Sequence, residues 1–112
     1  MKTFKDFLVE NEWIDVPGPK YDKLPSLKKG ERWSYSGVEN HPINKMKTIQ
    51  HHVTIKGVDM YSNGKEKPAR VHVGHDDTVY VQDGHHQYTS AVETKKSHIP
   101  AETWRIVKNE DI

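Results

Sequence analysis

Residues 69–96 read ARVHVGHDDTVYVQDGHHQYTSAVETKK, and this stretch decides the fold. Apolar residues alternate with Arg70 and His72 at its start, which is the period of a half-buried β-strand. The Gly-His-Asp-Asp run that follows predicts a turn. Residues 78–82 predict a second strand, because they are rich in β-branched and aromatic side chains.

The second strand leads into a predicted helix. The chain passes through Asp-Gly-His-His at residues 83–86 and continues to residue 96 without a helix breaker. One face of this helix would carry Tyr88, Ala91, Val92 and Lys95. Residues 99–101 end the connection, and residues 103–107 predict a closing strand. This order of elements predicts an α+β domain.

The junction of the second strand and the helix has the features of an anion-binding site. The first backbone N–H groups of a helix have no intrahelical partner and point outward. Gly84 would allow a sharp turn and leave room for a phosphate. His85 and His86 add ring donors beside it. Neutral donors in the first turn are Gln87, Thr89 and Ser90. The pattern therefore predicts a phosphate-binding turn.

The motif Asp83-Gly84-His85-His86 resembles the ParB/sulfiredoxin superfamily, specifically the small ParB-like proteins marked by Asp-Gly-His-His-Arg between a strand and a helix. The resemblance runs from residue 69 to 107 and includes Ala91-Val92 and Ile99-Pro100. It implies a small ParB/sulfiredoxin-like domain with a short mixed sheet and helices, whose motif loop binds nucleotide phosphates. Branches of this family are nucleotide switches on DNA, nucleotide-dependent phosphotransfer enzymes or nucleases.

The resemblance also implies roles for individual residues. Asp83 would shape the turn or present a carboxylate to a metal-bound nucleotide, so a nucleotide with Mg²⁺ is the cofactor it suggests. The implied catalytic residues are Asp83, His85 and His86. The implied phosphate- or nucleotide-binding residues are Gly84, His85, His86, Gln87, Tyr88, Thr89 and Arg70.

Gln87 departs from the family motif, which has arginine at this position. An arginine would make a charge-assisted, two-pronged contact with phosphate, and glutamine cannot. Phosphate affinity should therefore be weaker, unless Arg70, Lys95 or Lys96 supplies the missing charge. The departure leaves nucleotide hydrolysis an open question even if the fold is ParB-like.

Seven potential metal ligands fall between residues 72 and 86. They are His72, His75, Asp76, Asp77, Asp83, His85 and His86. The chain contains no His-Glu-x-x-His motif, and adjacent histidines on a turn rarely face one ion. We therefore expect no dedicated metal site. A structural turn with exposed imidazoles is the remaining alternative for the histidine pair.

Residues 41–55 predict an upstream helix. Asn40 would be its N-cap, and Pro42 would lie in its first turn, where a missing N–H is harmless. Its buried stripe would consist of Ile43, Met46, Ile49 and Val53. Gly57 would end this helix, and residues 61–68 would form a polar loop.

The first third of the chain is expected to be irregular. Residues 15–37 are interrupted by Pro and Gly and show no sustained period, which favours extended chain and turns wrapped over the core. The anchors of this segment would be Trp13, Tyr21, Leu24, Leu27 and Trp33.

Residues 1–10, MKTFKDFLVE, predict a short amphipathic helix and carry a second resemblance. They are similar to the capsid-targeting sequence of internal head proteins in large contractile-tailed bacteriophages, which begins Met-Lys-Thr-aromatic and ends Leu-x-Glu or Ile-x-Glu. This resemblance implies that Leu8 and Glu10 form the recognition motif of the prohead protease, which would cut between Glu10 and Asn11. Residues 11–112 would then be a single ParB-like domain. A terminal helix docked on the domain is the alternative.

Composition limits the remaining possibilities. A chain of 112 residues has room for one domain with one modest core. The absence of cysteine excludes disulfides, thiolate metal sites and cysteine nucleophiles. A net charge of +1 gives no long-range field that would attract DNA. No apolar run approaches the roughly 20 residues that span a bilayer, so no membrane partner is expected.

Three functions remain open from the sequence. The first is a phage protein packaged in the head and delivered to the host cytoplasm, where its ParB-like domain would bind a nucleotide or nucleic acid, as a nuclease or nucleotide hydrolase. The second is a non-catalytic inhibitor of a host defence protein built on the same fold. The third is a structural protein of the head interior.

Overall fold

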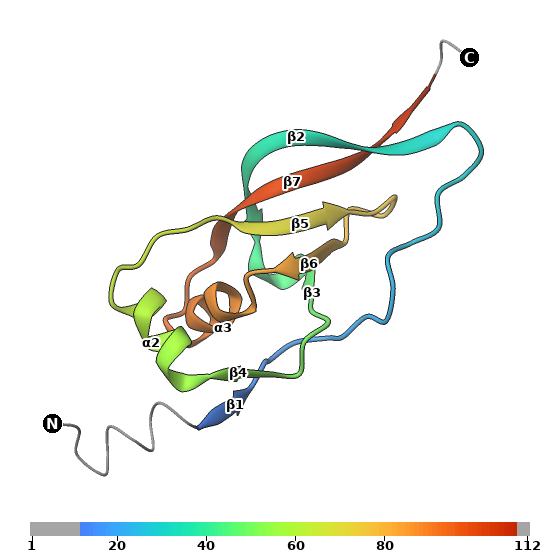
Figure 1. Cartoon of the computed structure of the whole chain (residues 1–112). Helices are drawn as coiled ribbons and strands as arrows, with labels where there is room; N and C mark the ends of the chain where they lie inside the picture. Colours follow the sequence, from blue (N-terminus) through green and yellow to red (C-terminus); the bar gives the residue numbers. More distant parts are fainter. Residues whose placement is uncertain (1–11, 110–112) are drawn as a thin grey trace, which may run out of the picture.

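The computed structural model describes residues 12–109, which form a small α+β fold around a mixed five-stranded sheet (Figure 1). The sheet has the strand order β2-β7-β5-β6-β3. Its strands are β2 (Glu31–Pro42), β3 (Met46–Lys47), β5 (Ala69–Val73), β6 (Val79–Asp83) and β7 (His98–Lys108). The β2–β7 and β5–β6 ladders are antiparallel, whereas β5–β7 and β3–β6 are parallel.

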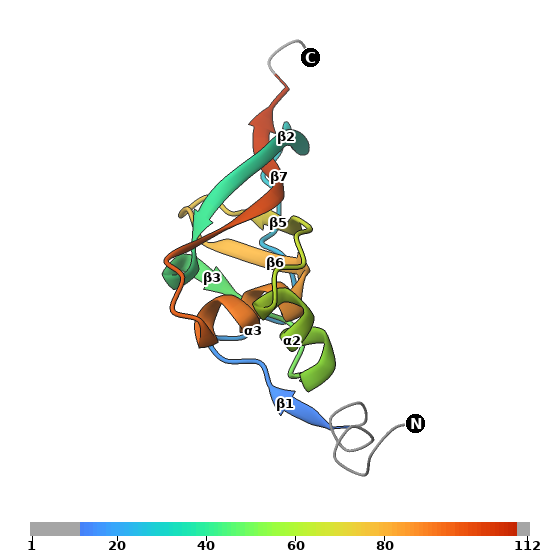
Figure 2. The ribbon, with the colours of Figure 1, turned by 90° about the vertical axis from the view of Figure 1, so that its left-hand side faces the viewer.

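Two helices and a second, small sheet complete the fold. The helices are α2 (Ile55–Ser62) and α3 (His85–Glu93), with a short 3₁₀ turn, η1, at Ile43–Lys45. The small antiparallel sheet pairs β1 (Trp13–Asp15) with β4 (His52–Thr54). Figures 1 and 2 show the two helices side by side, at the opposite end of the molecule from the projecting tip of the β2–β7 ladder.

The core lies between the sheet and the helices. Alternation in β5 and β6 turns one set of side chains inward, where Val71 and Val81 are completely buried. Tyr88 and Ala91 of α3 pack against them as part of the same cluster. The other members are Val16, Met46, Val53, Val58, Ala69, Val73, Val79, Ile99 and Ala101. The α+β class, the two central strands and the helix after the Asp-Gly-His-His motif are confirmed.

The predicted helix over residues 41–55 is wrong. Residues 41 and 42 end β2, and the chain then passes through η1, β3 and β4. Met46 and Val53 are buried as predicted, but they reach the core from two separate extended segments. The helix instead begins at Ile55, where the hydroxyl of Thr54 caps it by accepting the N–H of Gly57 at 3.2 Å. Gly57 lies inside this helix rather than at its end.

Between β1 and β2 the chain is irregular apart from one isolated bridge of Lys20 with Thr48, but residues 31–37, which were predicted to be irregular, belong to β2. Tyr21 is an anchor as predicted, because its ring is buried and its hydroxyl donates to the carbonyl of Val81 at 2.7 Å. Trp13 is not an anchor, since 61% of it is exposed on β1. The predicted helix over residues 1–10 and the predicted cleavage between Glu10 and Asn11 lie outside the described residues.

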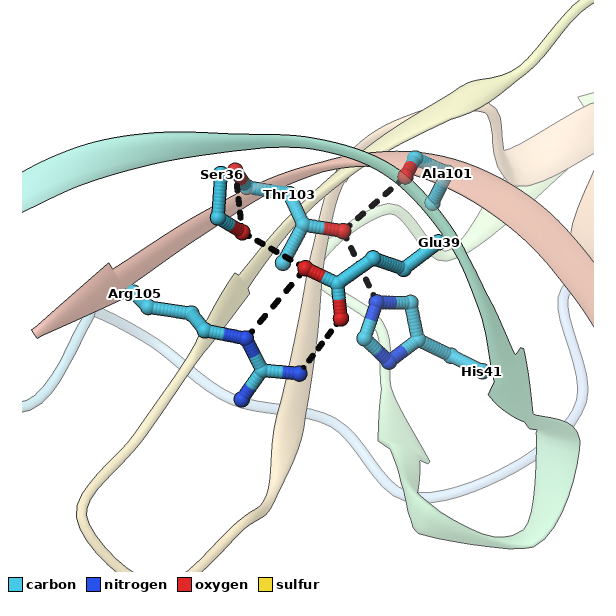
Figure 3. Close-up of polar contacts among 6 residues, drawn as sticks. All are labelled: Ser36, Glu39, His41, Ala101, Thr103 and Arg105. Atoms are coloured by element: carbon cyan, nitrogen blue, oxygen red, sulfur yellow. Dashed lines mark hydrogen bonds and ion pairs between the residues drawn. The ribbon is translucent and has the colours of Figure 1, made fainter.

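A polar network holds the bend of the β2–β7 ladder (Figure 3). The hydroxyl of Thr103 donates to the carbonyl of Ala101 at 2.9 Å and lies 2.8 Å from Nε2 of buried His41. Because the Thr103 proton is already used, His41 must donate from Nε2. Arg105 binds Glu39 at 2.7 Å, and the hydrogen bonds from Arg105 and then Ser36 lower the pKa of Glu39 to about 2. The network fixes the register of the two longest strands.

Candidate functional site

The turn between β6 and α3 has the strand–turn–helix geometry that the sequence predicts. Gly84 adopts φ 104°, a left-handed conformation that favours glycine, and stands at the N-cap of α3. The carboxylate of Asp83 accepts the N–H of Gly84 at 2.9 Å, which shapes the turn. The space beside Gly84 is filled by Ala69, whose Cβ would lie 2.5 Å from an added Cβ. Glycine is therefore required here by packing as well as by backbone conformation.

His85 is buried and holds a neighbouring loop. Only 3% of the residue is exposed, and its Nε2 accepts the backbone N–H groups of Ile49 at 3.2 Å and Gln50 at 3.3 Å. Burial lowers the pKa of His85 to about 4, so the ring is neutral near pH 7 and carries its proton on Nδ1. The Nε2 lone pair is already engaged by the protein's own backbone.

His86 points toward the start of α2. Its Nε2 lies 3.3 Å from the hydroxyl of Thr54, and its ring occupies the space beside Gly57. Burial, and then the charge of Lys65, lowers the pKa of His86. The structure thus brings both imidazoles of the motif to residues 49–57, the segment that leads into α2.

Three other predicted site residues make contacts away from the two imidazoles. Tyr88 and Thr89 are buried in the core, and the Thr89 hydroxyl donates to the carbonyl of His85 at 2.8 Å. The guanidinium of Arg70 lies over the Trp104 ring, 5.6 Å from its centroid, and 3.7 Å from the carboxylate of Glu102. Alternation along β5 turns Arg70 away from the buried face, and the strand register places it opposite Asp83, the first residue of the motif.

A cavity of about 430 Å³ lies beside α3, next to Gln87. Its walls come from β2, the end of α2 and the α2–β5 loop, the side of α3, and the start of β7. The lining residues are Val38, Tyr61, Lys65, Glu66, Lys67, Pro68, Gln87, Ser90, Ala91, Lys96, Ile99 and Pro100. The cavity therefore combines an apolar wall with a strongly polar rim.

Three lysines and one glutamate give this cavity an excess of positive charge. Lys96 is one of the residues that the sequence suggests could compensate for the missing arginine. Lys65 and Lys67 were missed, because they lie in a stretch that reads as a solvated loop. The signal that could have found them is the Lys-Glu-Lys-Pro run directly before a central strand.

The polar groups of the cavity are partly fixed by neighbouring contacts. The hydroxyl of Ser90 lies 2.7 Å from that of Ser62, which links α3 to α2. The side chain of Gln87 donates to the carbonyl of Lys67 at 3.5 Å. Lys65 lies over the Tyr61 ring, 5.1 Å from its centroid. These contacts place donors and cations around one hollow rather than at the tip of α3.

Neither a metal cluster nor a membrane-spanning helix occurs among residues 12–109. No group of three or more His, Cys, Asp or Glu side chains in that range could hold a metal ion. Both helices of this part of the chain are too short and polar to cross a bilayer.

The fold is similar to that of a solved ParB protein. A crystal structure of the C-terminally truncated chromosome-partitioning protein ParB from Caulobacter crescentus, complexed with CTP-γ-S, matches with a TM-score of 0.51 and 15% sequence identity. The match covers 61% of this chain and 44% of the ParB chain, so less than half of that protein is represented. No family model and no curated protein sequence matches. The ParB-like fold expected from the sequence is therefore confirmed.

Proposed function

We propose that the cavity beside α3 binds a nucleotide and that its lysines contact the phosphates. The observation that carries this proposal is the position of Lys65, Lys67 and Lys96 around a hollow of about 430 Å³ next to Gln87. That volume falls in the range of roughly 300–1,000 Å³ that is usual for small-molecule sites. Positive charge bordering such a hollow favours a bound phosphate, because charge-assisted hydrogen bonds to phosphate are strong.

The lining provides for both halves of a nucleotide. Tyr61, Ile99 and Pro100 offer apolar surface to a base or sugar, and the lysines and Gln87 offer donors to phosphate. Separate contacts from the three lysines would replace the single two-pronged phosphate contact that an arginine at position 87 would make. Any Mg²⁺ would arrive with the nucleotide, since residues 12–109 contain no metal-ligand cluster.

The ParB likeness favours a nucleotide over other anions. The ParB structure with the similar fold holds a CTP analogue. The experiment should compare cytidine, guanosine, adenosine and uridine nucleotides.

A nucleotide titration followed by NMR tests the proposal. Amide signals of residues 65–67 and 87–96 should shift on addition of a nucleoside di- or triphosphate, with and without Mg²⁺. The double variant Lys65→Glu, Lys67→Glu should lose the response. Lys23→Glu, an exposed lysine that does not line the cavity, is the matched control. If no nucleotide in the panel shifts these amides at millimolar concentration, the proposal is wrong.

Binding has more support than catalysis. The Nε2 lone pair of His85 is engaged by backbone N–H groups, and Gln87 stands where the family motif has arginine. Hydrolysis of a nucleotide, or DNA cleavage, would therefore rest on exposed Asp83 and half-buried His86 as acid–base groups. An Asp83→Asn variant should abolish any Mg²⁺- or Mn²⁺-dependent turnover. Turnover that survives this change would exclude Asp83 from the chemistry.

A non-catalytic inhibitor of a host defence protein is the second candidate. The observation that favours it is the structural use of both motif histidines, which hold residues 49–57 and leave the fold as a rigid scaffold. Recovery of one stoichiometric host protein on the purified chain, with binding unaffected by nucleotide, would support this candidate. Recovery of no such partner would eliminate it.

We further propose that residues 1–10 direct packaging into a phage head and that the prohead protease removes them after Glu10. The support is the sequence resemblance alone, because these residues lie outside the described range. The packaged protein would be located in the head interior and then in the host cytoplasm. Mass spectrometry of virions should find a protein N-terminus at Asn11. Detection of the intact Met1 terminus in mature heads would contradict the proposal.

A further inference from the structure

β2 is the outermost strand of the five-stranded sheet, and its outer edge is long. Figure 1 shows it at the border of the sheet, and among residues 12–109 it pairs with β7 alone. The strand at the opposite edge, β3, has only two residues. Residues 31–41 contain neither lysine nor proline, which commonly protect a sheet edge from further pairing. The outer edge of β2 is therefore a template on which another strand can pair.

Backbone donors and acceptors of β2 face this edge at regular positions. The carbonyl of Gly30 accepts the N–H of Asn109 at 2.7 Å, which sets the phase of the β2–β7 ladder. Hydrogen-bonded and non-hydrogen-bonded pairs alternate along an antiparallel ladder. The β2 residues opposite even-numbered residues of β7 therefore turn their N–H and C=O groups outward. Between residues 33 and 40 these are Trp33, Tyr35, Val38 and Asn40.

Two of these outward-directed residues also expose apolar side chains. Tyr35 is 52% exposed and Val38 is 56% exposed, although tyrosine and valine are typical of paired strands. Both lie on the outermost strand, where one more strand would cover them. The edge thus offers apolar contact together with backbone hydrogen bonding.

Two copies of β2 can pair antiparallel in a register that matches their faces. Arg32 and Glu39 both pair with odd-numbered residues of β7, so their side chains share one face of the sheet. Trp33 and Val38 both pair with even-numbered residues and share the other face. One register places Arg32 opposite Glu39 of the second copy and Trp33 opposite its Val38. A shift by one residue would set unlike faces against each other.

The same register also matches the charges. Arg32 is exposed and donates from Nε to Asn109 at 3.1 Å, and a guanidinium has further donors. The Glu39 side chain is 32% exposed, and its carboxylate can accept more than the hydrogen bonds from Arg105 and Ser36. Arg32 and Glu39 would form a non-hydrogen-bonded cross-strand pair, in which side chains lie closest. A shift by one residue would instead place Glu31 opposite Glu39.

We propose that β2 pairs with β2 of a second copy of this chain in an antiparallel, two-fold dimer. Each contact then occurs twice, as it does in any isologous interface. The occupant is a second copy because the edge is complementary to itself in both face and charge. A single strand pair buries less than the roughly 1,600 Å² of a standard stable interface, so the dimer should dissociate on dilution. The proposal does not depend on nucleotide binding.

Sedimentation equilibrium of the full chain, in a concentration series without nucleotide, tests the proposal. The natural chain should show a monomer–dimer equilibrium. Arg32→Glu should raise the dissociation constant roughly 10-fold or more, because both symmetric contacts with Glu39 become repulsive. Arg32→Lys keeps the charge and should dimerise nearly as well. Lys23→Glu makes the same charge change at an exposed position away from the edge and should have no effect.

A second pair of variants tests the strand edge itself. Val38→Lys should abolish the dimer, because an edge lysine opposes strand pairing. Val38→Ile should retain it, since the side chain stays apolar and β-branched. Urea unfolding at low concentration should give similar stabilities for both variants, because Val38 is exposed in the monomer. Val38 also lines the cavity, which is why nucleotide is left out.

Hydrogen exchange gives a readout specific to strand pairing. The amides of Trp33, Tyr35 and Val38 should exchange more slowly as the concentration rises, whereas that of Arg32, which faces β7, should not respond. The proposal is overturned if the full chain stays monomeric up to millimolar concentration. It is also overturned if Arg32→Glu and Val38→Lys dimerise normally, or if exchange of the three outward amides does not depend on concentration.

Discussion

The backbone N–H of Ile49 donates a 3.2 Å hydrogen bond to Nε2 of His85. This contact joins the first turn of α3 to the loop that precedes β4, two segments 36 residues apart in the chain. Gln50 donates to the same nitrogen at 3.3 Å, so one imidazole satisfies two backbone donors. Protonation of Nε2 would remove both hydrogen bonds at once. His85 therefore makes the position of the loop sensitive to pH.

Acid should destabilise the protein through this histidine. The pKa of His85 is about 4 in the folded chain, below the value near 6.5 of an unfolded chain. The unfolded state therefore binds the proton more readily, and the stability that His85 contributes is complete above about pH 6.5 and lost as pH falls toward 4. The loss should reach roughly 3 kcal/mol. Urea unfolding between pH 7.5 and 4 would measure it.

His85→Gln is the control for this pH dependence. The variant should be less stable at pH 7.5 and should show a shallower fall in unfolding free energy toward pH 4. Some slope should remain, because burial also lowers the pKa of His41, His72 and His86. An unchanged slope in the variant would mean that His85 does not titrate in this window.

Gly57→Ala should destabilise the protein although alanine is the better helix former. An added Cβ would lie 2.2 Å from Cδ2 of His86, whose half-buried ring also contacts the hydroxyl of Thr54. Overpacking of this kind costs roughly 1–3 kcal/mol, which exceeds the gain of about 1 kcal/mol from helix propensity. Chemical denaturation would measure the net change.

The effect of Gly57→Ala on stability should change sign when the His86 ring is removed. In a His86→Ala background, Gly57→Ala should stabilise the protein by roughly 0.5–1 kcal/mol, since only the propensity term remains. Asp59→Ala, at an exposed position of α2, should change stability by less than about 0.5 kcal/mol and controls for general effects on the helix. Destabilisation in both backgrounds would show that the clash is not with His86.

The two central strands could be predicted because apolar residues alternate along them in the sequence and buried side chains alternate along them in the structure. Val71 and Val81 alternate with polar residues, and the sheet buries one side of each strand. The helix predicted over residues 41–55 failed for a physical reason as well. Met46 and Val53 are spaced as on a helix, but they reach the core from β3 and β4. Their burial depends on pairing with distant strands, which local spacing does not encode.

The sequence predicted which residues belong to the strand–helix turn, but it did not predict where their side chains point. The motif correctly placed Gly84 at the strand–helix turn. The orientation of His85 depends on the donors of Ile49 and Gln50, which come from a loop that the sequence had placed in a helix. Lys67 lines the cavity because the chain enters β5 beside α3. The pattern of charges in the sequence does not show that these two segments lie next to each other.

Gly84→Ala should destabilise more than an alanine at another left-handed glycine. Gly84 combines φ 104° with an added Cβ only 2.5 Å from Cβ of Ala69, so strain and clash add to roughly 2–5 kcal/mol. Gly64 has a similar φ of 107° but open space around it, so Gly64→Ala should cost only about 1 kcal/mol. Thermal unfolding of the two variants compares them directly. Equal losses would mean that the backbone conformation, not Ala69, sets the cost.

Thr103→Val should weaken the bend of the β2–β7 ladder by removing the acceptor of His41. The Thr103 oxygen accepts from Nε2 of the buried imidazole while its proton binds the carbonyl of Ala101 (Figure 3). Valine keeps the shape but leaves the buried Nε2–H of His41 without its acceptor, which costs roughly 1–3 kcal/mol. Thr103→Ser keeps the hydroxyl and should lose less. If Thr103→Val unfolds at the same urea concentration as the natural chain, the hydroxyl does not contribute to stability as an acceptor for His41.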